Sequence, residues 1–244
     1  MHSIPPRRPP ARRSPGRSAG VLLTAALAAT LLLLAACGGS SVNAADLLKR
    51  AQDKLASTNS LHFIMKVDHP GTGTIDNPYA TDAQGDIRRP DGLNATATVN
   101  VGGLSFSVQL IILGSDQWYT NPLTGKFEKT SGFESFLKIF DPQTGLAALL
   151  TALQGPSKPA EGSANGTACW KISGTIDPQL LQPLFGDTAP GPVPTTFCIG
   201  KDDNRLYSAV LTGKVTAGDT DQTVRTFFLS KFDAPVTINT PTTG

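Results

Sequence analysis

The sequence predicts an α+β fold in which one long antiparallel meander of strands carries helices on a single face. Many stretches alternate apolar and polar residues with period two, and turn residues separate them, as in half-buried strands. A helical pattern precedes these stretches, and shorter apolar helical segments interrupt them. Charged residues make up only 16% of the chain, which has 24 glycines and 19 prolines, and this composition suits short strands joined by turns.

The first expected element is a helix that begins after Asn43. Asn43 is suited to cap its N-terminus, and Asp46 lies in the first turn, where a carboxylate interacts favourably with the helix dipole. The residues from Ser57 to Asn59 end the pattern. Helical spacing gathers one apolar face, which must pack on another element, from Ala44, Leu47, Leu48, Ala51 and Leu55.

Ten strands are expected along the remaining chain. Period-two alternation and flanking turn residues place them at 61–68, 81–88, 93–101, 104–113, 117–120, 126–129, 169–176, 195–199, 205–214 and 222–230. The clearest is 104–113, where Ser105, Ser107 and Gln109 face away from the apolar residues. The apolar face of that strand consists of Leu104, Phe106, Val108, Leu110 and Ile112.

Helical segments with bulky apolar faces are expected at 133–140, at 146–153 and after Asp177-Pro178. Helices on the concave side of a curved sheet can enclose an apolar ligand between the two layers. The same side chains can also simply fill a core, and periodicity does not distinguish these alternatives. If a ligand cavity exists, its expected lining is Phe63, Met65, Val67, Phe106, Val108, Leu110, Ile112, Phe136, Phe140, Leu149 and Leu150.

The N-terminus has the layout of an export signal. Residues 1–20 contain five arginines and no acidic residue, and an uncharged, leucine-rich stretch follows from Val21 to Leu34. This stretch is shorter than the about 20 apolar residues that span a bilayer. The sequence Leu34-Ala35-Ala36-Cys37 resembles the lipobox of bacterial lipoproteins, in which the cysteine thiol is acylated and the chain is cut before it. An ordinary secretory signal and a twin-arginine route through Arg12-Arg13 are the alternatives.

This interpretation divides the chain into three parts. Residues 1–36 are the expected signal peptide, 37–42 a lipidated flexible tether, and 43–244 a single lipid-binding domain. We therefore expect Cys37 to be the site of lipid attachment and the chain to be held on the extracytoplasmic face of the cell membrane.

Cys169 and Cys198 remain as an even pair outside the cytosol, where disulfides persist. A disulfide between them is favoured, and its loop of about 30 residues would add roughly 3–4 kcal/mol to stability. Two buried free thiols are the alternative. A metal site is disfavoured, because these cysteines with His62 and His69 show no recognisable ligand spacing.

Charge and motifs exclude several classes of function. Removal of the five signal arginines lowers the basic count from 21 to 16 against 19 acidic residues, so the mature net charge is −3. No basic cluster with interleaved aromatic residues remains, which argues against nucleic-acid binding. The chain has no nucleophile elbow, zincin motif, Walker loop or dinucleotide fingerprint. We expect neither an enzyme nor a bound cofactor or metal.

Several segments, in order along the chain, resemble the mycobacterial and actinobacterial lipoproteins of the LppX, LprA, LprF and LprG group. The resemblance covers nearly all of the mature chain. It is carried by the initial helix and by Ser60-Leu61-His62-Phe63, Ala83-Gln84-Gly85-Asp86-Ile87, Ile139-Phe140-Asp141-Pro142 with Gly145-Leu146, residues 169–176, and 229–238.

The resemblance implies a half-open β-barrel, formed by a curved antiparallel sheet with helices against its concave face, as in lipoprotein carriers. It also implies that an acylated lipid or glycolipid is bound in an apolar cavity and carried across the cell envelope. A lipid exporter of the inner membrane is then a candidate partner. The alternative function is a non-carrier surface lipoprotein that acts in signalling or adhesion through its exterior.

Overall fold

A computed structural model of the chain describes residues 42–243, except 75–77 and 187. Within it, Val42–Gly244 forms one compact unit. The expected signal peptide and the lipid-attachment residue Cys37 lie outside the described residues. None of the described helices is long and apolar enough to cross a membrane.

The unit consists of four described helices and eleven strands. The helices are α2 (Ala44–Ala56), α3 (Glu134–Lys138), α4 (Leu146–Ala152) and α5 (Pro178–Phe185). The strands of the first half are β1 (Ser60–Asp68), β2 (Tyr79–Arg88), β3 (Gly92–Val101), β4 (Leu104–Leu113), β5 (Asp116–Thr120) and β6 (Phe127–Thr130). Those of the second half are β7 (Ala160–Ala164), β8 (Thr167–Ile176), β9 (Val193–Gly200), β10 (Leu206–Thr212) and β11 (Val224–Ser230).

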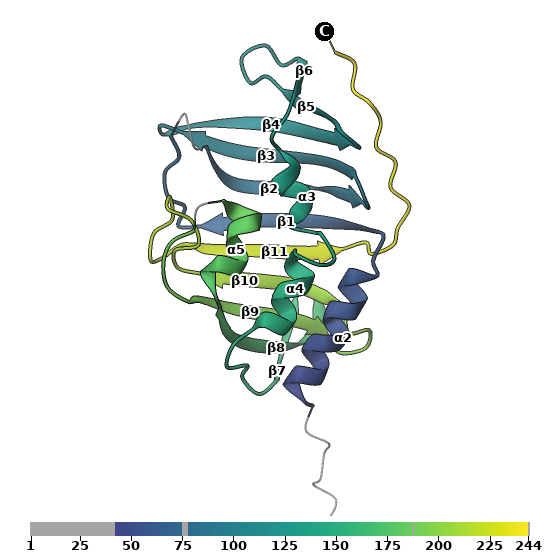
Figure 1. Ribbon diagram of the computed structural model, residues 1–244, viewed down its shortest axis with the longest axis vertical. Coiled ribbons are helices and arrows are strands. Elements are labelled where there is room, and N and C mark those ends of the chain that lie inside the picture. The colour runs from purple at the N-terminus through teal and green to yellow at the C-terminus, as the bar shows by residue number, and fades with distance from the viewer. Residues whose placement is uncertain (1–41, 75–77, 187, 244) are drawn as a thin grey trace, which may run out of the picture. The chain divides into compact units, whose positions relative to one another are not determined.

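All eleven strands form one antiparallel sheet, in the order β6-β5-β4-β3-β2-β1-β11-β10-β9-β8-β7. The α+β class and the antiparallel sheet are confirmed, but the connectivity differs from one long meander. Two meanders, β1–β6 and β7–β11, join where β1 pairs with β11. Between them the chain crosses the sheet through α3 and α4, and β6 and β7 are the outermost strands (Figure 1).

All four described helices lie on the same face of the sheet (Figure 1). This is the face on which β1 places Phe63 and Met65, opposite Leu229 and Phe227 of β11. Helix α2 begins as expected: the Asn43 side chain accepts from the backbone N–H of Asp46. Helices α2 and α4 each bury three leucines and one alanine, and these side chains pack against each other. Helix α2 also contacts β9.

The opposite face carries a smaller apolar cluster. Ile111 and Trp118 are buried there beneath the C-terminal segment, which contributes Ile238 and Val236. In Figure 1 this segment runs from β11 back towards β6, where Thr243 pairs with Phe127. The final residues therefore cover an apolar patch that the helices cannot reach.

Arg89, in the turn between β2 and β3, joins both layers. Its Nη1 donates to the carbonyl oxygens of Leu55, Ala56 and Thr58 at the end of α2, at 2.6–3.0 Å. Its Nε and Nη2 donate to the carbonyl oxygen of Phe140, just after α3. Burial lowers the pKa of Arg89 from its ordinary value. The guanidinium thus satisfies carbonyls that the helix end leaves without intrahelical partners.

At the other end of the sheet, Cys169 of β8 and Cys198 of β9 form a disulfide, with their Cα atoms 5.5 Å apart. The two thiols expected to pair are therefore joined between neighbouring strands. Both residues are buried, and Tyr207 and Ala164 pack around them.

Replacement of Arg89 by alanine should lower the free energy of unfolding by about 3 kcal/mol or more, because several partly buried carbonyls lose a charged donor. Urea unfolding would measure the change. Arg88→Ala is the matched control, since Arg88 is also half-buried but has no recorded hydrogen bond from its side chain among the described residues. Equal effects of the two substitutions would contradict the role given to Arg89.

Replacement of both Cys169 and Cys198 by alanine should lower the free energy of unfolding by about 3.5 kcal/mol, the value expected for opening a loop of this length. The residues are 29 positions apart. Denaturant unfolding of the oxidised protein and of the double variant tests this, and a difference below about 1 kcal/mol would contradict the chain-entropy account.

Candidate functional site: a cavity between two helices and the sheet

A cavity of about 760 Å³ lies between α3, α5 and the helix-bearing face of the sheet. We call it the α3–α5 cavity. Its floor is formed by β1, β2 and β11, and the β1–β2 and β10–β11 connections form its rim. The described residues that line it are Met65, Thr72, Thr74, Pro78, Tyr79, Ala80, Phe136, Ile139, Gln182, Pro183, Leu184, Phe185, Gly186, Thr216, Ala217, Gly218 and Arg225.

One wall of the cavity is apolar. Helix α3 contributes Phe136, its C-cap contributes Ile139, and α5 contributes Leu184 and Phe185. Strand β1 contributes Met65. Helix α5 begins at Pro178, where the N-cap Asp177 accepts from the backbone N–H of Gln179. The helix buries Leu181 and Leu184. Apolar walls of this kind exclude water and favour hydrocarbon.

The opposite wall contains a buried ion pair. Arg225 Nη1 and Nη2 donate to Asp219 Oδ2 and Oδ1 at 3.2 and 3.1 Å. The Tyr79 hydroxyl donates to Asp219 Oδ1 and accepts from Arg225 Nη2 at 3.3 Å. The Asp219 side chain is fully buried and that of Arg225 is 5% exposed. Both side chains of the pair are therefore almost completely shielded from water.

Asp219 is held ionised by its partners. Burial acts to raise its pKa, but the hydrogen bonds and the charge of Arg225, with the Tyr79 hydroxyl and the Thr216 N–H, outweigh burial and lower the pKa below its usual value. Burial and the hydrogen bond to Asp219 raise the pKa of Tyr79 to about 12. At neutral pH the group consists of a carboxylate, a guanidinium and a neutral phenol.

The lining expected from the sequence is only partly gathered at this cavity. Met65 and Phe136 line it. Phe106 and Val108 lie half-buried on the same face of the sheet, beyond the helices. The remaining expected lining residues are buried in the main core: Phe63, Val67, Leu110, Ile112, Phe140, Leu149 and Leu150.

Sequence reasoning missed the polar wall and the contribution of α5. A signal for Arg225 exists in the sequence, because the alternation of β11 puts it on the same face as Phe227 and Leu229. A charged residue on the apolar face of a strand is expected to be buried or to face a cavity. Tyr79 and Asp219 carry no such signal, since the network forms across 140 residues of chain.

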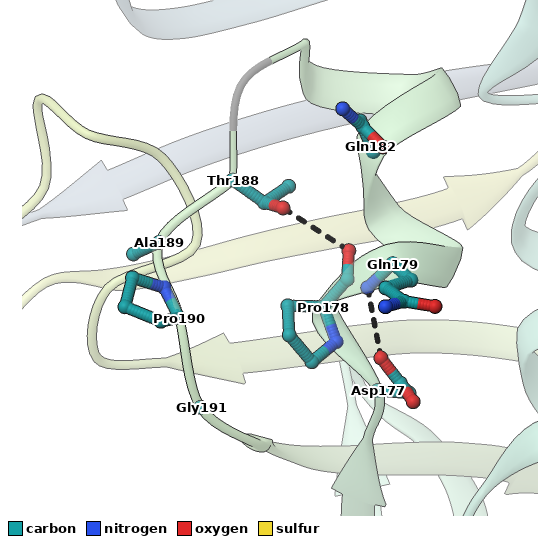
Figure 2. A pocket seen from close by; sticks show the side chains of 8 residues that line it. All are labelled: Asp177, Pro178, Gln179, Gln182, Thr188, Ala189, Pro190 and Gly191. Carbon is teal, nitrogen blue, oxygen red and sulfur yellow. Dashed lines mark hydrogen bonds between the residues drawn. The ribbon is translucent and has the colours of Figure 1, made fainter.

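A second, more open depression of about 470 Å³ lies beside the start of α5 (Figure 2). It is lined by Gln179 and Gln182 of the helix and by the loop residues Thr188, Ala189 and Pro190. Figure 2 shows the Thr188 hydroxyl donating to the carbonyl of Pro178, which holds the loop against the helix. Gln182 lines both hollows, so this depression adjoins the α3–α5 cavity.

Among the described residues, no group of His, Cys, Asp or Glu is arranged to hold a metal ion. His62 of β1 pairs instead with Asp86 of the adjacent β2, Nδ1 to Oδ1 at 2.8 Å, on the face that carries no helices. The site's physical chemistry is therefore that of an apolar cavity with one polar wall.

Comparison with known proteins adds an independent line of evidence. The family model described as LppX_LprAFG lipoprotein matches residues 43–238. Lipoprotein LprA of Mycobacterium tuberculosis is 29% identical over 177 residues, which cover 67% of this chain and 69% of that protein. The lipoarabinomannan carrier protein LprG of Mycobacterium leprae is 24% identical over 201 residues, 80% of each chain.

A solved structure has the same fold. The crystal structure of LprF from Mycobacterium bovis superposes with a TM-score of 0.66 at 20% identity, over 82% of this chain and 97% of that one. The half-open, helix-covered sheet is therefore shared with a protein of very different sequence.

Replacement of Asp219 by asparagine should lower the free energy of unfolding at pH 7 by about 3–5 kcal/mol, because it leaves the Arg225 charge buried without a counterion. The lowered pKa of Asp219 means that its contribution is complete above the unfolded-state pKa of about 3.9 and is lost as the pH falls through the folded-state value. The difference between native protein and variant should therefore shrink as the pH falls below about 4.

Urea unfolding at several pH values measures this difference. Asp141 and Asp233 also have lowered pKa values, but they are present in both proteins and cancel. Asp221→Asn, on the same loop with a 90% exposed side chain, is the control and should change stability by less than about 0.5 kcal/mol. A pH-independent difference for Asp219→Asn would contradict the ionised pair.

Proposed function

The chain belongs to the LppX_LprAFG lipoprotein family, and on this premise we propose that it is a lipid-anchored carrier of acylated lipids or glycolipids in the cell envelope. The α3–α5 cavity would hold the acyl chain, and no chemical step on the ligand is involved. The observation that carries the proposal is a cavity of about 760 Å³ with an apolar wall between the helices and the sheet.

The size and chemistry of the cavity support this role. Ligand pockets in proteins have volumes of about 300–1,000 Å³, and this cavity falls within that range. Each CH₂ of an acyl chain gains about 0.8 kcal/mol when it leaves water. A cavity wall of Met65, Phe136 and Phe185 can therefore compete with the interior of a membrane for a chain of ordinary length.

The N-terminal sequence supports the anchoring part of the proposal. Cys37 follows Leu34-Ala35-Ala36 and precedes the folded unit by only a few residues. A lipid on Cys37 would keep the cavity close to the extracytoplasmic face of the membrane and raise the effective concentration of its ligand. An exporter in the inner membrane would be the natural source of that ligand.

The direct test is the lipid content of the purified domain. Val42–Gly244 forms one compact unit with its own core, so it can be produced without the N-terminal segment. Native mass spectrometry of this domain, followed by organic extraction, should reveal bound acylated lipid. A domain that carries no lipid and takes up no labelled acyl lipid would refute the carrier proposal.

A bulky substitution inside the cavity should separate binding from folding. Ala80→Trp places an indole in the α3–α5 cavity and should reduce uptake of a labelled acyl lipid at least about tenfold, or about 1.4 kcal/mol, by filling space the chain needs. Ala45→Trp makes the same change at an exposed position of α2 and should leave uptake unchanged. Equal uptake by both folded variants would place the lipid outside this cavity.

A further inference from the structure

The α3–α5 cavity has one charged side chain among the described residues that line it, and that side chain is Arg225. Its guanidinium lies 5.3 Å from the centre of the Phe185 ring and 5.8 Å from that of Tyr79. Burial of a charge is costly even when the charge is paired, so the position of Arg225 at the cavity wall calls for a reason beyond packing.

Neutralisation of Asp219 accounts for only part of this arrangement. Asp219 lies behind Arg225, does not line the cavity, and is fully buried. Its Oδ2 also accepts from the backbone N–H groups of Val215 and Thr216 at 3.0 and 2.7 Å, and its Oδ1 accepts from the Tyr79 hydroxyl. These neutral donors offset part of the carboxylate charge, so a ligand in the cavity meets mainly the positive guanidinium.

Arg225 also has hydrogen-bonding capacity to spare. A guanidinium has five N–H donors, and the recorded bonds use one on Nη1 and two on Nη2. The Nε–H and the second Nη1–H have no recorded acceptor in the described part of the chain. Among the described residues, the fully enclosed side-chain nitrogen without a partner belongs to Arg205, not to Arg225. The Nε of Arg225, which has no recorded acceptor, is therefore not fully enclosed by the protein.

We propose that Arg225 binds an anionic head group, a phosphate or a carboxylate, of the acylated ligand. This inference rests on the proposed carrier function and specifies its ligand class. The head group would accept from the spare N–H donors beside the Tyr79 hydroxyl, while the acyl chain extends along Met65, Phe136 and Leu184. Charge-assisted hydrogen bonds of this kind are short and strong, and more so where water is excluded.

A competition between a phospholipid, a fatty acid and a neutral lipid that share the palmitoyl chain tests the proposal. The domain Val42–Gly244 is incubated at pH 8 with equimolar dipalmitoyl phosphatidic acid, palmitic acid and dipalmitoylglycerol, and the bound lipids are counted by native mass spectrometry. The native domain should prefer at least one anionic lipid over dipalmitoylglycerol by about tenfold or more. A preference for phosphatidic acid alone identifies phosphate, and a preference for palmitic acid alone identifies a carboxylate.

The informative variant removes both charges of the pair, Arg225→Gln with Asp219→Asn, so that no unpaired charge is left buried. It should still bind dipalmitoylglycerol but lose the anionic preference. Arg225→Lys keeps the charge without the Nε–H and should retain a reduced preference, which protects the test if the double variant folds poorly. Arg205→Gln is the control, because Arg205 also contacts an aromatic ring, Phe232, and pairs with an aspartate, Asp233, but lies away from the cavity.

The outcomes separate the two proposals. A native domain that binds all three lipids equally, or a folded double variant that keeps the anionic preference, would overturn the role of Arg225 and leave the carrier function standing. A domain that binds none of the lipids would overturn the carrier function itself. Loss of the preference in Arg205→Gln would show that it reflects the overall charge of the protein, and would also overturn the proposal.

Discussion

The described helices are too small to cover the whole apolar face of the sheet, and the rest of the structure depends on this constraint. Eleven strands present one continuous face, and three of the four described helices are eight residues or shorter. Helices α2 and α4 seal the β8–β9 half, where Leu150 and Ile172 are fully buried. Over β2–β4 the cover is incomplete: Ala80, Val99 and Phe106 lie side by side and only half-buried, and Leu104 is 65% exposed. Apolar surface left open beside a cavity is what a lipid-binding protein requires.

Two arginines in this incomplete layer have different consequences. Arg89 bonds to the carbonyl oxygens at the ends of α2 and α3, so it fixes helices to the sheet without a buried carboxylate as partner. Arg225 has a carboxylate partner in Asp219, and the pair faces a cavity instead of a helix end. Both places combine a desolvated cation with well-aligned acceptors, the condition under which a buried charge is tolerated. Arg89 holds the helices on the sheet, and Arg225 places a charge at one wall of the α3–α5 cavity.

Much of this fold follows from local patterns. Asn43 and Ser57 bound α2 as expected, and β4 begins at Leu104 and ends at Leu113 as its alternation and flanking turns predict. β7 escaped prediction, since Ala-Glu-Gly-Ser-Ala lacks β-branched and aromatic residues and forms a strand only as an edge beside β8. The pairing of β1 with β11 and the Tyr79–Asp219–Arg225 network are long-range, and no local pattern specifies them. Alternation predicted which side chains face the helices, but not which of them line the cavity and which fill the core.

Photolabelling tests most directly whether the α3–α5 cavity holds an acyl chain. The domain Val42–Gly244 would be loaded with a fatty acid that carries a diazirine near the middle of its chain, irradiated, and digested for peptide mapping by mass spectrometry. The account predicts labels on α3, α5 and β1, centred on Phe136, Phe185 and Met65. Labels confined to the opposite face of the sheet, near Trp118 and Ile238, would contradict it.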